Sequence, residues 1–167
     1  QQGNYADAIV YFTRAVQLTP DMAKARYNLG KALDIQGRFD EALEQFQATI
    51  RLEPDWPAPM NDFALLVVTH PELKSRDVNE AIGLARRACE LTNYKNTAFL
   101  ITLGVAYSSA NRFSEAALTL ETALNLDPNS AALHNGLGNV LLSQGKFKEA
   151  IGQMQRSLEI EPNNPDA

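Results

Sequence analysis

Apolar and small side chains recur along this chain with a long, fixed period. Segments 95–128 and 129–162 are each 34 residues long and carry the same residue types at the same places, and a related segment spans 21–54. A period of this length is typical of arrays in which each unit is a pair of helices joined by a turn. The matching positions are a Leu-Gly pair, an alanine and a closing proline: Leu29-Gly30, Leu103-Gly104 and Leu137-Gly138; Ala42, Ala116 and Ala150; Pro54, Pro128 and Pro162.

The residue types at these positions predict how the two helices of one unit pack. Gly30 lies on the expected first helix and Ala42 on the second, and small side chains at both places let the helix backbones approach closely. Glycine inside a helix costs about 0.5 to 1 kcal/mol relative to alanine, so its recurrence indicates a packing requirement. The prolines disfavour helix in the residue before them and end each second helix. Nine helices are predicted, with Asp21 and Asp40 as N-caps: 5–18, 22–36, 39–52, 56–68, 78 onward, 97–110, 113–126, 131–144 and 147–160.

This pattern resembles the tetratricopeptide repeat, and the resemblance covers nearly the whole chain. It implies an all-α fold, a right-handed α-α superhelix of about four and a half helix-turn-helix units. It also implies a non-catalytic scaffold for protein–protein interaction. Residues 1–167 then form a single array: a half repeat at 1–20, repeats at 21–54, 55–94, 95–128 and 129–162, and the start of a further unit at 163–167.

The unit at 55–94 departs from the period. Val67 and Ala81 are 14 residues apart, whereas the equivalent positions of the other units are nine apart. The extra residues fall in the loop at 69–77. Insertions in such arrays map to loops on one face, so both a tolerated elaboration and a functional contact remain open for this loop.

Composition and charge exclude some classes of binding partner. The formal net charge of −5 and the pI near 5.0 argue against nucleic-acid binding, which needs a basic stripe that no predicted helix carries. No apolar run reaches the roughly 18 residues of a membrane span, so direct insertion of this segment into a membrane is not expected. Cys89 is the only cysteine and is expected to be a buried thiol. It leaves the compartment open, with the cytoplasm favoured over the periplasm.

A search for chemistry finds no catalytic, cofactor-binding or metal-binding pattern. His70 and His134 lack cysteine or carboxylate partners at metal-ligand spacing. The glycines occur singly rather than in a phosphate-binding loop, and no nucleophile motif is present. We therefore predict that the chain is not an enzyme and needs no cofactor.

The expected binding surface is the concave groove that first helices line in tetratricopeptide arrays. Carried over from that resemblance, the groove residues change in character along the array, from basic and aromatic through apolar to side-chain amides. Such a groove suits a peptide with an acidic end followed by apolar residues. The alternative is that Leu65, Ile101 and Val105 only pack between neighbouring first helices. The candidate peptide-binding residues are Lys24, Tyr27, Lys31, Asn61, Leu65, Ile101, Val105, Asn135 and Asn139.

Some family members hold the carboxylate of a chaperone tail with a clamp of Lys, Asn and Arg. Here Lys31 is the one basic residue at those positions, and Asp62 would repel a carboxylate, so chaperone-tail binding is not expected. Segment 80–116 is also similar to repeat regions of bacterial membrane proteins related to glycosyltransferases, and Leu137-Gly138-Asn139 is similar to the array of O-linked N-acetylglucosamine transferase. A substrate-recruiting arm of a glycosyltransferase is thus one alternative function, and end-to-end self-association is another.

Overall fold

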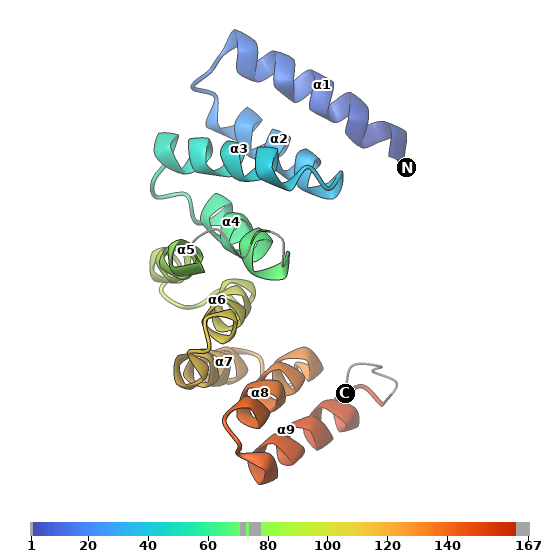
Figure 1. The fold of residues 1–167 in the computed structure, drawn as a ribbon, viewed down its shortest axis with the longest axis vertical. Coiled ribbons are helices and arrows are strands. Elements are labelled where there is room, and N and C mark those ends of the chain that lie inside the picture. Colours follow the sequence, from blue (N-terminus) through green and yellow to red (C-terminus); the bar gives the residue numbers. More distant parts are fainter. Residues whose placement is uncertain (1, 71–72, 74–77, 163–167) are drawn as a thin grey trace.

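The computed structural model describes residues 2–70, 73 and 78–162 of the protein. Consecutive helices stack along the long axis of the molecule, so that α1 and α9 lie at opposite ends of the array (Figure 1). This confirms the predicted all-α class and the predicted number of helices. Nine α-helices and no strand make up the described part of the chain: α1 (Gln2–Leu18), α2 (Ala23–Ile35), α3 (Phe39–Leu52), α4 (Pro57–Thr69), α5 (Val78–Leu91), α6 (Thr97–Ser109), α7 (Phe113–Leu126), α8 (Ala131–Ser143) and α9 (Phe147–Ile160).

Close approach of paired helices depends on the glycine and alanine positions seen in the sequence. Ala42, Ala116 and Ala150 are fully buried. A Cβ atom placed on Gly30 would lie 2.7 Å from Cε1 of Phe46 and 3.3 Å from the carbonyl oxygen of Ala42. Any side chain at position 30 would therefore have to displace the buried Phe46 ring.

Tight turns join the helices within three of the pairs. After α2, Gly37 adopts φ +73°, its N–H donates to the Asp34 carbonyl, and the Arg38 N–H donates to the Leu33 carbonyl at 2.9 Å. This is a Schellman motif, which satisfies the last carbonyls of the helix. The turns after α6 and α8 are similar. The Arg112 N–H donates to the Tyr107 carbonyl, the Lys146 N–H donates to the Leu141 carbonyl, and Asn111 and Gly145 adopt positive φ.

The helix ends confirm the role of the prolines and correct two predicted caps. Second helices α3, α7 and α9 each end two residues before a proline, with one capping residue in between. These prolines are Pro54, Pro128 and Pro162. Asp21 and Asp40 are not N-caps, because Met22 and Arg38 occupy those positions. The side chains that do cap helices are those of Asn96 and Ser130, which accept hydrogen bonds from the backbone N–H groups of Phe99 and Leu133.

A continuous apolar spine runs from α1 to α9 instead of one central core. First helices α4 and α6 contact each other directly, in addition to the contacts of each helix with its neighbours in sequence. The insertion predicted at 69–77 and the further unit predicted at 163–167 fall largely outside the described residues; within the loop, Leu73 is buried in the spine.

Candidate functional site

Two cavities open on the first-helix face, by which we mean the face formed by α2, α4, α6 and α8. One lies between α6 and α8, and the other lies between α2 and α4. We call them the α6–α8 groove and the α2–α4 cavity. Together they contain most of the residues that the sequence placed on the binding surface.

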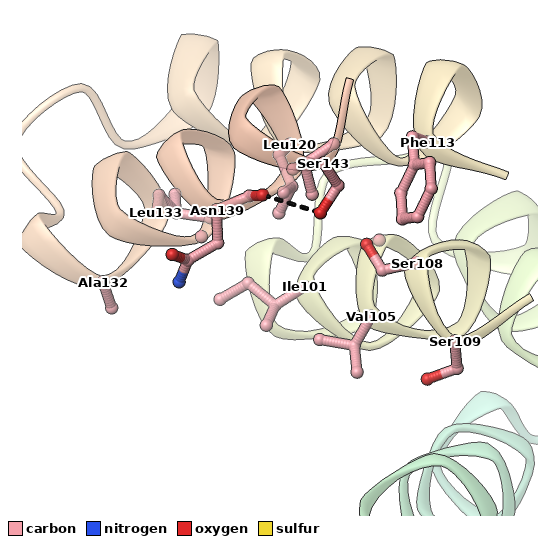
Figure 2. A pocket seen from close by; sticks show the side chains of 13 residues that line it. Ile101, Val105, Ser108, Ser109, Phe113, Leu120, Ala132, Leu133, Asn139 and Ser143 are labelled. Atoms are coloured by element: carbon pink, nitrogen blue, oxygen red, sulfur yellow. Dashed lines mark hydrogen bonds between the residues drawn. The ribbon is translucent and has the colours of Figure 1, made fainter. Parts of the chain in front are cut away.

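The α6–α8 groove has a volume of about 510 Å³ and an apolar interior. Figure 2 shows Ile101 and Val105 of α6 facing α8, with Leu120 and Phe113 of α7 on the adjoining side. Ile101 and Val105 are half-buried and pack against the spine, so they serve as both core and groove wall. An open apolar hollow of this size accommodates an apolar side chain of a partner.

Small residues on α8 keep the groove open. Gly136 and Ala132 line it, whereas the positions of α2, α4 and α6 equivalent to Gly136 carry Asn28, Asp62 and Thr102. A Cβ on Gly136 would meet only Leu120 Cδ1 at 3.8 Å, an ordinary contact. Close packing therefore does not require this glycine, unlike Gly30. Sequence analysis missed Gly136, although its difference from the equivalent residues in the other units was visible.

Polar groups surround the apolar interior of the groove. Asn139 is exposed, and its side-chain amide forms no hydrogen bond within the described part of the chain. The Ser143 hydroxyl donates to the backbone carbonyl of Asn139 at 3.1 Å (Figure 2). Ser108 and Ser109 complete the polar edge on α6. An amide with free donors and a free acceptor can bind the backbone of an extended peptide.

The α2–α4 cavity is smaller, about 300 Å³, and carries charges of both signs. The Tyr27 hydroxyl donates to Asp62 Oδ2 at 2.7 Å, and burial together with this carboxylate raises the pKa of Tyr27. Lys31 Nζ lies 5.6 Å from the centre of the Tyr27 ring. Burial also raises the pKa of Asp34 above its ordinary value. The sequence predicted a basic amino-terminal section of the groove. In the structure this section is not basic, because the carboxylates of Asp34 and Asp62 line the cavity beside Lys31. The lining residues are Lys31, Asp34, Asp62, Leu65, Leu66, Thr69 and His70.

The structure separates the candidate residues into four groups. Ile101, Val105 and Asn139 line the α6–α8 groove, and Lys31 and Leu65 line the α2–α4 cavity. Lys24 lines a third hollow, beside Trp56 at the turn between α3 and α4. Tyr27, Asn61 and Asn135 line none of these cavities.

Asn61 is more buried than a residue expected to contact a peptide in the groove. The residue is only 7% exposed, and its Nδ2 donates to Asp62 Oδ1 at 3.2 Å. The bonds from Asn61 and Tyr27 hold the two carboxylate oxygens of Asp62 in place. Asn61 therefore orients the cavity residue Asp62 and leaves little of its own side chain exposed to a partner.

The side chains of His70, His134 and Cys89 each pack against or bond to other parts of the protein. His134 bonds to Gln153 Oε1 through Nδ1 at 2.7 Å and to the Pro128 carbonyl through Nε2 at 3.1 Å, which ties α8 to α9. The His70 ring lies 3.8 Å from the Phe39 ring, centre to centre. Burial raises the pKa of the Cys89 thiol to about 11, so the reactive thiolate is scarce at neutral pH.

The described residues offer neither a cluster of metal ligands nor a membrane-spanning helix. They contain no group of three or more His, Cys, Asp or Glu side chains arranged to hold a metal ion. None of the helices in that part of the chain combines the length and hydrophobicity of a membrane span.

Comparison with known families decides the nature of the repeat. Two family models, both described as tetratricopeptide repeat, match residues 1–60 and residues 101–165. The chain belongs to the tetratricopeptide repeat family. Its matched regions include the units with the regular Leu-Gly, alanine and proline spacing.

Relatives of this tetratricopeptide repeat chain are mostly longer proteins. Human tetratricopeptide repeat protein 6 is 24% identical over 155 residues, covering 92% of this chain and 28% of the relative. BBSome complex member BBS4 of Bos taurus is 24% identical over 149 residues, covering 89% of this chain and 27% of the relative. The chain thus spans about a quarter of the length of these curated relatives. They lend no support to the resemblance with glycosyltransferase-attached arrays.

Solved structures show the same tetratricopeptide fold. MamA of Desulfovibrio magneticus RS-1, solved from residue 41 to its end, superimposes with a TM-score of 0.85 at 18% identity, over 98% of this chain and 89% of MamA. YrrB, described as a tetratricopeptide repeat protein with an unusual peptide-binding site, gives a TM-score of 0.84 at 18% identity, over 98% of this chain and 81% of YrrB. At these identities the likeness concerns the fold alone.

Proposed function

We propose that this chain is a non-catalytic protein-interaction scaffold that binds an extended peptide segment along its first-helix face. In this proposal an apolar side chain of the peptide enters the α6–α8 groove, and the Asn139 amide binds the peptide backbone. The observation that carries it is the groove itself, an apolar hollow of about 510 Å³ with a free amide on its edge. Membership of a family of interaction modules and the peptide-binding description of YrrB support the same class of function.

The groove can be filled from within to test the proposal. A leucine at position 136 would project into the hollow, and Gly136 has room for a Cβ, so Gly136→Leu should fold. Replacing a helical glycine also removes a cost of about 1 kcal/mol, so the variant should be at least as stable as the parent. Gly152→Leu is the matched control, because Gly152 lies on α9 with nothing within 4 Å of its Cβ position.

The assay begins with selection of peptides from a phage-displayed random library on the parent chain. Affinities of the enriched peptides are then measured by isothermal titration calorimetry. We expect Gly136→Leu to weaken binding about ten- to a hundredfold, the value of one buried apolar side chain, while Gly152→Leu binds like the parent. Unchanged binding by Gly136→Leu, with native circular dichroism, would exclude the groove as the peptide site.

Self-association is a second candidate, favoured by one observation on the surface of α9. Phe147, Ile151 and Leu158 of α9 are 64%, 55% and 41% exposed. Their equivalents on α7 are half-buried or buried, because α8 packs beside α7. Two chains joined through α9 would cover this stripe. Multi-angle light scattering over a range of concentrations tests the idea: Ile151→Glu should abolish a dimer formed by the parent, and a parent that stays monomeric at high concentration would eliminate it.

A further inference from the structure

The α2–α4 cavity has the composition of a pocket for a long basic side chain. Leu65 and Leu66 form an apolar wall, and Asp34 and Asp62 provide carboxylates. Lysine and arginine pair an aliphatic stem with a charged head, so they match such a combination of apolar wall and carboxylate. The ionisable side chains lining the cavity are the carboxylates of Asp34 and Asp62, Lys31 and His70.

The positions of the charges favour a cation over an anion. Asp62 is held by hydrogen bonds from Tyr27 and Asn61, so it is oriented without being neutralised. The side-chain carboxylate of Asp34 forms no hydrogen bond and no ion pair in the described part of the chain. Burial raises its pKa, and the nearby His70 and Lys31 partly offset that rise. The ammonium of Lys31 lies over the Tyr27 ring. No ion pair joins Lys31 to either carboxylate within the described residues.

A metal ion is a poorer occupant than an organic cation. A tightly bound Ca²⁺ ion takes six to eight oxygen ligands, and a Mg²⁺ ion held by only one or two carboxylates usually relies on substrate phosphates as well. No group of three or more potential metal ligands of the kinds His, Cys, Asp and Glu occurs in the residues that the structure describes. A metal ion has no aliphatic chain, so the apolar wall formed by Leu65 and Leu66 would not stabilise its binding.

We propose that the α2–α4 cavity binds a lysine or arginine side chain of the same peptide whose apolar side chain enters the α6–α8 groove. This inference rests on the proposed function and adds a second requirement to its ligand. The two cavities are about two helix spacings apart, roughly 16 to 20 Å, which about five to six residues of extended peptide span. The ligand class is therefore a peptide with a basic and an apolar residue separated by that distance.

The test uses peptides of about twelve residues, which are long enough to reach both cavities. Sequences enriched by the parent chain should carry Lys or Arg about five to six positions from an apolar residue. An enriched peptide is then synthesised with an acetylated amino terminus, so that its only ammonium is the lysine, and again with norleucine in place of that lysine. We expect the lysine peptide to bind about fivefold more tightly.

Substitution of the protein isolates the carboxylate. Asp34→Asn keeps the shape of the side chain and should remove most of the preference for lysine while leaving affinity for the norleucine peptide unchanged. Asp7→Asn on α1 is the matched control for net charge, and it should behave like the parent.

The outcomes separate this inference from the proposed function. If Gly136→Leu abolishes binding but the lysine and norleucine peptides bind the parent equally, the groove stands and the basic subsite is refuted. Enrichment of acidic peptides, or equal weakening of both peptides by Asp34→Asn, also refutes the subsite. If Gly136→Leu has no effect, the proposed function fails. A lysine preference that Asp34→Asn removes and Asp7→Asn retains supports both.

Discussion

Gly30→Ala tests the packing on which the repeat depends. In α2 the new Cβ would lie 2.7 Å from Cε1 and 2.9 Å from Cδ1 of Phe46, and 3.3 Å from the carbonyl oxygen of Ala42. An ordinary carbon–carbon contact is about 3.5 to 4.0 Å. The Phe46 ring would therefore have to move by about 1 Å, although it is 1% exposed and surrounded by core.

Two opposing contributions set the size of the effect. Overpacking of a filled core costs about 1 to 3 kcal/mol, and alanine in place of glycine in a helix returns about 0.5 to 1 kcal/mol. Gly152→Ala receives the helix contribution alone, because no atom lies within 4 Å of the Cβ position. The free energies of unfolding of the two variants should therefore differ by about 1 to 3 kcal/mol, with Gly152→Ala the more stable.

Urea unfolding followed by circular dichroism measures this difference, and thermal unfolding supports it through a shift of about 2 to 4 °C per kcal/mol. Gly138→Ala is an informative intermediate, because its Cβ would meet the flexible Met154 side chain at 2.9 Å instead of an aromatic ring. We expect it to be less destabilising than Gly30→Ala. If Gly30→Ala were as stabilising as Gly152→Ala, close approach of paired helices would not explain the recurrent glycine.

Three further predictions concern single side chains. The buried Ser157 hydroxyl donates to the Ala131 carbonyl at 2.9 Å, so Ser157→Ala should lower the free energy of unfolding by about 1 kcal/mol, whereas the exposed Ser143→Ala should change it little. The Cys89 thiol, with its pKa of about 11 and no exposed surface, should react with a disulfide reagent only after unfolding. Folding raises the pKa of Asp34, so the charged carboxylate lowers the free energy of unfolding at neutral pH. This loss of stability disappears as the pH falls below the ordinary pKa of about 4. Asp34→Asn should therefore be more stable than the parent at neutral pH, and the difference in free energy of unfolding should vanish in acid.

Most of the fold was predictable because the repeat states each structural requirement several times. The second helices at 39–52, 113–126 and 147–160 match the predicted bounds, since an aromatic residue begins each and a proline follows each. The two N-cap predictions were wrong because they considered Asp21 and Asp40 by residue type alone. The turn geometry places the capping position elsewhere, at Met22 and Arg38.

The candidate site was less predictable, because a helix face shows which side chains lie together but not what they contact. Asn61 falls on the expected face, yet its side chain is buried and donates a hydrogen bond to Asp62. Gly136 contributes to the groove through the side chain it lacks, and a search for chemically active residues overlooks such a position. The charge of the α2–α4 cavity depends on Asp62, which reaches the cavity from the neighbouring first helix.

The most direct measurement is methyl NMR of the chain during titration with an enriched peptide. The account predicts that the methyl signals of Ile101 and Val105 shift strongly and give nuclear Overhauser contacts with the apolar side chain of the peptide. Leu118 on α7 and Ile151 on α9, which are exposed outside the groove, should not shift. Saturating binding that shifts Leu118 or Ile151 and leaves Ile101 and Val105 unperturbed would contradict the account.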